Sequence, residues 1–162
     1  MNGFPVALTR NPGRPIDGDW ALYALFQQLV WRKPGSEEAK GLTLFARVIG
    51  APSAQNLIDI YVDGGMTLTG LIPHRPDDGL AIGIIYSGIS DQASDSDQDA
   101  GLSVVRNFEL AFEICYTAQL EMGWTLQPDF QYIVNPGGNV LNANGTEAAN
   151  AAVFGVRTTL SF

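Results

Sequence analysis

The sequence predicts an all-β fold, an antiparallel up-and-down transmembrane β-barrel segment of seven strands with the remnant of an eighth. Three observations predict it. Apolar and polar residues alternate over several long windows, aromatic residues stand towards the window ends, and long loops alternate with short turns between the windows. Such alternation indicates strands whose two faces meet different environments.

The earlier predicted strands have less regular patterns than the later ones. Residues 19–33 and 41–50 are expected strands with unclear registers: in the first, Phe26 and Val30 share one face while Trp31 falls on the other. Residues 58–72 and 79–90 alternate more regularly, and the remnant of an eighth strand lies around residues 4–10. No segment has a competing helical period, so we predict no helix.

The three C-terminal windows, residues 104–118, 120–135 and 152–162, alternate most clearly. Each is about 11 to 16 residues long, two to three times the usual strand length of ~5 or 6. Only Arg106 interrupts the apolar face of the first window. In the second, Pro128 withdraws a backbone donor, so we expect a bulge or an early end to pairing there.

The connections differ in kind along the chain. Working back from the C-terminus, residues 136–148 and 91–103 are long loops, whereas the join near Leu120 and residues 73–78 are tight turns. Residues 51–57 and 34–40 have similar, medium lengths, so the contrast fades there. Long loops on one side and short turns on the other are typical of outer-membrane barrels.

The orientation of the apolar face separates a membrane barrel from a soluble one. A lipocalin-like barrel points its apolar face inward, and a membrane barrel points it outward. The apolar faces are long enough for the ~9 to 11 residues of a tilted membrane strand. Aromatics such as Trp20, Trp124 and Phe162 lie where interfacial girdles are expected. These features favour the membrane barrel, with polar side chains in an aqueous lumen.

Composition excludes several other classes of protein. Lys and Arg number 9 against 17 Asp and Glu, and the net charge is −8, so nucleic acid is not an expected partner. Cys115 and His74 are single residues of their types, which leaves no internal disulfide and no usual metal cluster. We expect no cofactor. The charged fraction of 16% is below the roughly 25% of soluble domains.

Several motifs in order resemble the carbohydrate-selective porins of the OprB family. Residues 126–133 with 135–138 resemble the family's penultimate strand and loop, and residues 153–157, closing on Phe162, resemble its last strand. Residues 65–73, then 75–78 and 80–83, resemble its Arg-Pro-Asp-Asp hairpin. The match covers nearly the whole chain, so residues 1–162 are interpreted as the C-terminal part of a porin barrel.

The resemblance implies a barrel of about 16 strands in the bacterial outer membrane that conducts small sugars. It implies outer-membrane lipid as surroundings and the barrel assembly machinery as a partner, with Phe162 and Leu160 as the assembly signal. It also implies that the signal peptide and N-terminal strands of the family are missing from this sequence. Monomer and oligomer both stay open.

A porin lumen offers hydrogen-bond donors and acceptors to sugars rather than catalytic groups. The predicted sugar-contacting residues are Asn107, Glu109, Glu113, Gln127, Asp129, Gln131 and Arg157. Alternatively, they only hydrate the lumen or form a structural charge lattice in which Arg157 neutralises a neighbouring acid. Glu109 and Glu113 would stand about 13 Å apart along a strand, too far for a carboxylate dyad, so an enzyme is not expected.

The acidic loop at residues 91–99 contains the pattern Asp95-x-Asp97-x-Asp99. An EF-hand would then need Gly and Glu where the sequence has Ala100 and Arg106, so we predict no metal site. We expect a solvated extracellular loop. The functions left open are a sugar-selective channel, a soluble lipocalin-like carrier of an apolar ligand, and a non-conducting fragment of a longer porin.

Overall fold

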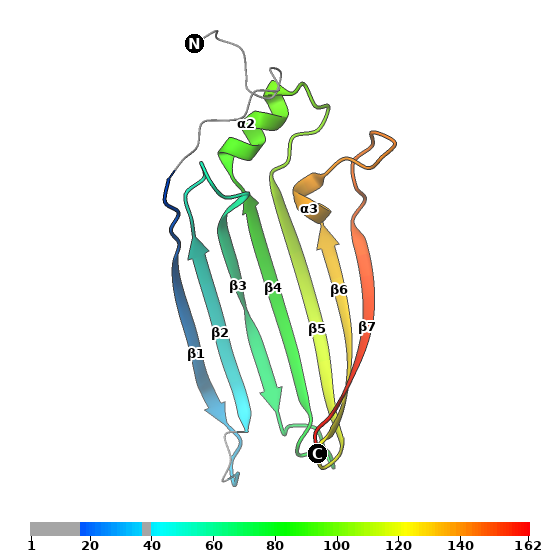
Figure 1. The fold of residues 1–162 in the computed structure, drawn as a ribbon. Helices are drawn as coiled ribbons and strands as arrows, with labels where there is room; N and C mark the ends of the chain where they lie inside the picture. The colour runs from blue at the N-terminus through cyan, green and yellow to red at the C-terminus, as the bar shows by residue number, and fades with distance from the viewer. Residues whose placement is uncertain (1–16, 37–39) are drawn as a thin grey trace.

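The computed structural model describes residues 17–36 and 40–162. Seven strands form one sheet in chain order, each antiparallel to the next (Figure 1). The strands are β1 (Leu22–Arg32), β2 (Gly41–Gly50), β3 (Ile58–Thr69), β4 (Gly79–Ile89), β5 (Phe108–Glu121), β6 (Trp124–Val134) and β7 (Ala151–Leu160). The predicted all-β meander is confirmed, and the expected remnant at residues 4–10 lies outside the described residues.

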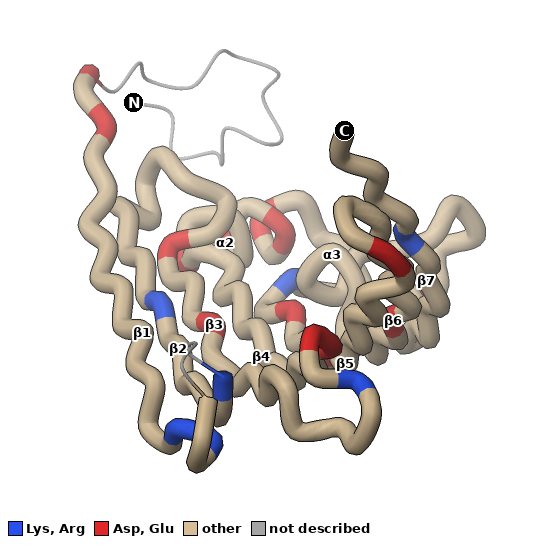
Figure 2. Tube along the Cα trace, turned by 90° about the horizontal axis from the view of Figure 1, so that it is seen from below, with Lys and Arg blue, Asp and Glu red and all other residues tan. Residues whose placement is uncertain are grey.

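The sheet is a single curved layer, a trough seen end-on in Figure 2. Among the described residues, the buried apolar side chains are Cys115 and Ala118, so no conventional core exists between two layers. In β4, Ile82, Ile84 and Tyr86 are exposed, whereas the residues between them are half-buried. Side chains inside a curve crowd one another, so the exposed even positions lie on the convex face.

The register separates the two faces along the whole sheet. One convex row, read across the strands from β1 to β7, contains Gln28, Leu44, Met66, Ile82, Ile114, Phe130 and Phe154. The neighbouring concave row contains Gln27, Phe45, Gly65, Gly83, Glu113, Gln131 and Val153. Apart from Gln28, the convex row is apolar. The apolar face is therefore outside, as a membrane barrel requires and as a lipocalin-like carrier forbids.

Turns and loops gather at opposite ends of the sheet. Residues 33–36, 40, 70–78 and 122–123 lie in the connections at the lower end of Figure 1, and residues 51–57, 90–107 and 135–150 lie in those at the upper end. The upper end also carries two short helices, α2 (Asp91–Asp99) and α3 (Pro136–Asn139). In the described part of the chain, neither helix has the length and apolarity needed to cross a membrane.

Helix α2 corrects the prediction of an acidic loop without helices. Its N-terminus is capped by Ser90, whose hydroxyl accepts a hydrogen bond from the Ala93 amide at 3.4 Å. The buried residue of the helix is Asp97, which binds Arg106 through two side-chain hydrogen bonds of 2.7 Å. Those bonds lower the pKa of Asp97 although burial acts to raise it. A helix packed through a carboxylate has no apolar period, so the pattern gave no sign of it.

The same ion pair explains why β5 begins at Phe108 instead of at residue 104. The backbone amide of Arg106 also donates to Asp97, at 3.1 Å, and its carbonyl accepts from the Ser94 hydroxyl at 2.7 Å. Arg106 thus binds α2, and the next residue, Asn107, accepts a hydrogen bond from the Ile89 amide of β4 at 2.7 Å just before β5 begins. The apparent interruption of the apolar face at Arg106 lies outside the strand.

Two further expectations about strands need correction. A bulge in β1 between Leu29 and Trp31 brings Trp31 opposite Leu42, on the convex face rather than the concave one. Pro128 neither ends β6 nor shifts its register: pairing with β5 steps from Asp129 to Leu126 with the same alignment, while Pro128 pairs with Val156 of β7. The missing N–H of Pro128 interrupts the pairing of β6 with β5 locally, and the pairing with β7 keeps β6 in the sheet.

The turn at residues 70–78 is fixed by a buried carboxylate. Asp78 is 1% exposed and accepts hydrogen bonds from Arg75 Nε at 2.7 Å, from the Tyr116 hydroxyl, and from the Gln119 amide at 2.9 Å. Burial acts to raise the pKa of Asp78, but these hydrogen bonds and the Arg75 charge outweigh it and hold the pKa below its usual value. The Arg-Pro-Asp-Asp motif therefore ties its hairpin to β5.

Candidate functional site

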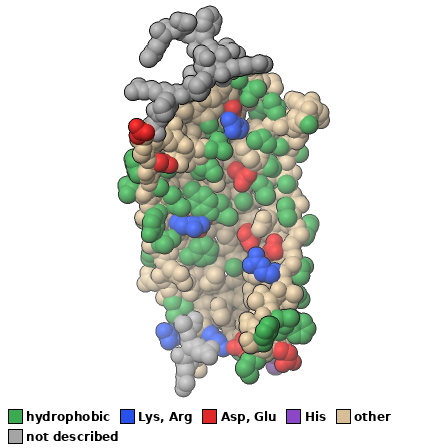
Figure 3. Space-filling model, in the orientation of Figure 1, with side chains coloured by type: hydrophobic (Ala, Val, Ile, Leu, Met, Phe, Trp, Pro, Cys, Tyr) green, Lys and Arg blue, Asp and Glu red, His purple; other side chains and the backbone are tan. Residues whose placement is uncertain are grey.

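The concave face of the sheet carries the charged side chains of the strands. Figure 3, which shows this face, places cationic and anionic side chains at mid-height, surrounded by uncharged ones. Strand register puts the predicted residues Glu113, Gln127, Asp129, Gln131 and Arg157 on this one face. The sequence prediction therefore identified a shared surface.

The predicted residues pair across β5, β6 and β7. Glu113 lies opposite Gln131, and Gln127 lies opposite Arg157. Gln127 donates its side-chain N–H to Cys115 Sγ at 2.9 Å. Arg157 is exposed on the edge strand β7, and the described residues give it no ion pair, so the expected neutralisation of a neighbouring acid is not formed in this part of the chain.

Asp129 and Gly155 make a close cross-strand pair. A Cβ on Gly155 would come within 2.4 Å of Asp129 Oδ1, so the glycine leaves the space in which the carboxylate lies. The Asp129 side chain therefore lies down over β7 instead of projecting from β6. This arrangement keeps a negative charge on the concave face.

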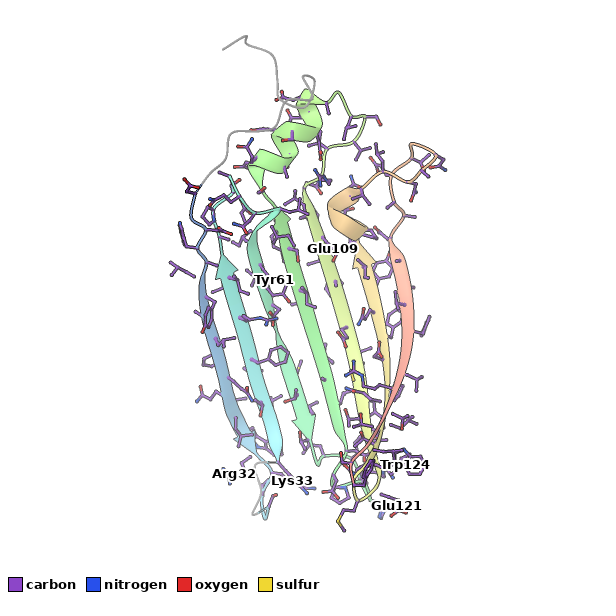
Figure 4. All side chains as sticks on the ribbon, viewed as in Figure 1. Arg32, Lys33, Tyr61, Glu109, Glu121 and Trp124 are labelled. Atoms are coloured by element: carbon purple, nitrogen blue, oxygen red, sulfur yellow. The ribbon has the colours of Figure 1, made fainter. Side chains whose placement is uncertain are left out.

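The two remaining predicted residues lie at the loop end, apart from the others. Glu109, labelled in Figure 4 near α3, accepts a hydrogen bond from the Gly137 amide at 2.6 Å. Asn107 precedes β5, and its side chain accepts from the Phe108 amide at 2.6 Å while its own amide donates to Gly138 O at 2.9 Å. Both residues hold the loop that follows β6, which is a structural task.

A cluster on β2 and β3 escaped the sequence analysis. Arg47 Nε donates to Asp63 Oδ2 at 2.6 Å, and Arg47 Nη2 donates to the Tyr61 hydroxyl at 3.1 Å. The guanidinium carbon also stands 5.0 Å from the centre of the Tyr61 ring, a cation–π distance. Tyr61 is labelled on β3 in Figure 4. The alignment of Arg47 with Asp63 follows from a hairpin centred on residue 55, which was the signal available in the sequence.

These residues line an open groove of about 220 Å³ on the concave face. Its lining includes Phe45 and Arg47 of β2, Asp63 of β3, Gly83 of β4 and Glu113 of β5. Phe45 is half-buried, and the side chains of Arg47 and Asp63 are 42% and 13% exposed. The groove offers an aromatic surface, hydrogen-bond donors and carboxylate acceptors to one small solute.

The last strand ends near two predicted residues, Leu160 and Phe162. Leu160 ends β7 opposite Trp124, and Phe162 follows two residues later with a fully exposed side chain.

Across residues 17–36 and 40–162, no three His, Cys, Asp or Glu side chains gather into a group that could hold a metal ion. The acidic pattern at residues 95–99 lies on α2, where Asp97 is engaged by Arg106.

Comparison with known proteins gives consistent results. The model of the family described as carbohydrate-selective porin, OprB family, matches residues 1–162. Porin B of Pseudomonas aeruginosa PAO1 is 27% identical over 169 residues, which cover 97% of this chain and 36% of that protein. The high-pH structure of Pseudomonas putida OprB superposes with a TM-score of 0.86 at 25% identity, covering 99% of this chain and 40% of that one. The chain therefore spans about two-fifths of the length of these relatives.

Proposed function

This chain belongs to the OprB family of carbohydrate-selective porins, which lie in the bacterial outer membrane, and we propose that its sheet forms part of the wall of a sugar channel. Small neutral sugars diffuse passively along the concave face, and no covalent bond is made or broken. The observation that carries the proposal is the division of the sheet into an aliphatic convex face and a concave face with charged and amide side chains.

The two faces suit two different solvents. Exposed Ile82, Ile84 and Phe112 on the convex face meet the hydrocarbon of the outer membrane at little cost. On the concave face, the charged side chains of Glu113 and Asp129 stay in water and avoid a desolvation penalty of several kcal/mol. We assign Asn107, Glu109, Gln127, Gln131 and Arg157 to the same lumen, with Asn107 and Glu109 at its loop end.

Further strands are needed to close the barrel. Because every neighbouring pair is antiparallel, β1 and β7 run in the same direction. A closed antiparallel barrel then requires an odd number of strands between β7 and β1, for example nine in a barrel of about 16. Without them, the free N–H and C=O groups of both edges would face hydrocarbon. Seven strands by themselves would therefore not conduct.

The experiment is a chimaera in which this chain replaces the matching two-fifths of Pseudomonas putida OprB. Refolded into liposomes, the chimaera should swell them faster in glucose than in a zwitterion of similar size, and the 162-residue chain alone should not swell them. Equal rates for the two solutes would refute sugar preference. No swelling by the chimaera would refute the channel, and swelling by the chain alone would refute the need for further strands.

The exposed C-terminal Phe162 is proposed as the signal read by the barrel assembly machinery, with Leu160 as the apolar residue two positions before it. Deleting Phe162 from the chimaera should lower the amount of barrel in the outer membrane of expressing cells, while refolding in detergent stays unchanged. An undiminished amount in the membrane would refute this role.

A further inference from the structure

The side chain of Phe45 reaches from β2 across the concave face towards β3 and β4. Its Cζ atom is 2.8 Å from the position that a Cβ on Gly65 would occupy and 3.9 Å from the same position on Gly83. Gly65 and Gly83 are its cross-strand neighbours on β3 and β4. Two glycines in one row thus leave the space that the tip of the ring occupies, and the ring lines the groove.

Hydrogen-bonding groups line the same groove as the Phe45 ring. Glu113 follows Gly83 in the same row, is half-buried, and has no hydrogen-bond or ion-pair partner among the described residues. Arg47, two residues along β2 from Phe45, uses two of its five N–H donors on Asp63 and Tyr61. Its remaining donors and 42% exposed side chain are available to a solute in the groove.

We propose that Phe45, Arg47 and Glu113 form a binding subsite for a single neutral pyranose in the channel wall. This rests on the proposed function and assigns the residues that hold one of its solutes. One face of a pyranose with equatorial hydroxyls carries only C–H groups, which pack on the Phe45 ring as other flat rings do. The hydroxyls at its edge donate to Glu113 and accept from Arg47. The groove of about 220 Å³ is below the ~300 to 1,000 Å³ of pockets for drug-sized ligands, which suits one sugar ring.

The charges at the subsite select against acidic sugars. Asp63 neutralises Arg47 at 2.6 Å, so the carboxylate of Glu113 leaves the groove with a net negative charge. A pyranose acid of similar size, such as glucuronate, would meet that charge at short range, whereas glucose would use it as a hydrogen-bond acceptor. The subsite is therefore expected to prefer glucose to glucuronate.

The test is binding to the 162-residue chain folded in detergent micelles, measured by saturation-transfer NMR with glucose and glucuronate as probes. We expect saturation transfer to the C–H protons of one face of glucose, and weaker binding of glucuronate. Phe45→Leu should weaken glucose binding about tenfold, equivalent to about 1.4 kcal/mol, and Phe45→Trp should restore it. The matched control is Phe112→Leu on the convex face, which should leave binding unchanged.

A second pair of variants tests the charge argument. Glu113→Gln keeps an acceptor but removes the charge, so glucuronate binding should rise several-fold. Asp129→Asn changes a concave carboxylate outside the groove and should leave the ratio of glucose to glucuronate affinity unchanged. Circular dichroism confirms that each variant is folded. The subsite is refuted if the folded chain binds no glucose, or if Phe45→Leu binds it as tightly as the parent.

The two proposals fail in different ways. If the chimaera conducts glucose and the Phe45→Leu chain binds glucose normally, the subsite is refuted and the channel is supported. If the chain binds glucose through Phe45 and the chimaera does not conduct, the channel is refuted and the subsite is supported.

Discussion

Replacement of Asp78 by Asn is expected to be the most damaging single substitution in the lower turns. The carboxylate is 1% exposed and accepts from the Arg75 side chain, the Tyr116 hydroxyl and the Gln119 amide. Asn has the same shape, but one of its two terminal atoms donates rather than accepts. At least one of the three donors then faces another donor in a buried site.

The expected loss of unfolding free energy is about 2 to 4 kcal/mol, because hydrogen bonds to a charged group are worth roughly 1.5 to 3 kcal/mol each and a buried unpaired group adds its desolvation cost. The contact with Arg75 contributes the least, since that side chain is 39% exposed and can be hydrated. Most of the loss therefore comes from the anchoring of the turn to β5.

The assay is urea unfolding of the chain in detergent micelles, followed by tryptophan fluorescence. The neighbouring Asp77→Asn is the matched control: Asp77 is 60% exposed and paired with Lys40 at 2.9 Å, so its loss should be below about 1 kcal/mol. If the two variants unfold at the same urea concentration, the assignment of Asp78 as the anchor of this hairpin is wrong.

Three further predictions concern acid, the upper loop and the convex face. Because hydrogen bonding lowers the folded-state pKa of Asp78, its contribution is present above the unfolded pKa of about 3.9 and disappears as the pH falls through the folded value. The stability advantage of the parent over Asp78→Asn should therefore shrink below about pH 4 in the same urea assay, and a constant advantage would contradict it. Arg106→Lys keeps the charge but cannot bind Asp97 at two points, so amide exchange of residues 91–99 should accelerate about tenfold by mass spectrometry, whereas unchanged protection would contradict the role of the pair. Ile84→Lys, on the convex face, should cost about 2 to 4 kcal/mol in lipid, and the adjacent Ile85→Lys, on the concave face, should be tolerated; equal costs in lipid unfolding assays would contradict the assignment of faces.

Alternation of apolar and polar residues was enough to predict the strands because each strand separates two solvents. The window at residues 79–90 matches β4, and residues 41–50 match β2. Alternation does not predict an element whose packing depends on a polar side chain. Helix α2 packs through Asp97 and has no apolar stripe, although Ser90 followed by Asp91 was a recognisable N-terminal signal.

The candidate site was predicted in part, for a related reason. Glu113, Asp129 and Gln131 could be assigned to one face because parity along a strand is visible in the sequence. The approach of Arg47 to Asp63 depends on hairpin register, which alternation alone does not fix. The position of the Phe45 ring depends on two glycines on other strands, so the pattern along a single strand does not predict it.

In the proposed channel wall, the concave face contacts water and the convex face contacts lipid. Cysteine accessibility on β6 tests it most directly, in the chimaera in liposomes after Cys115→Ser removes the native thiol. Gln131→Cys and Tyr132→Cys are adjacent in the chain and lie on opposite faces of the sheet. We expect a charged, membrane-impermeant thiol reagent to modify the cysteine at position 131 and to leave the cysteine at position 132 unmodified. Modification at position 132 with protection at position 131 would contradict it.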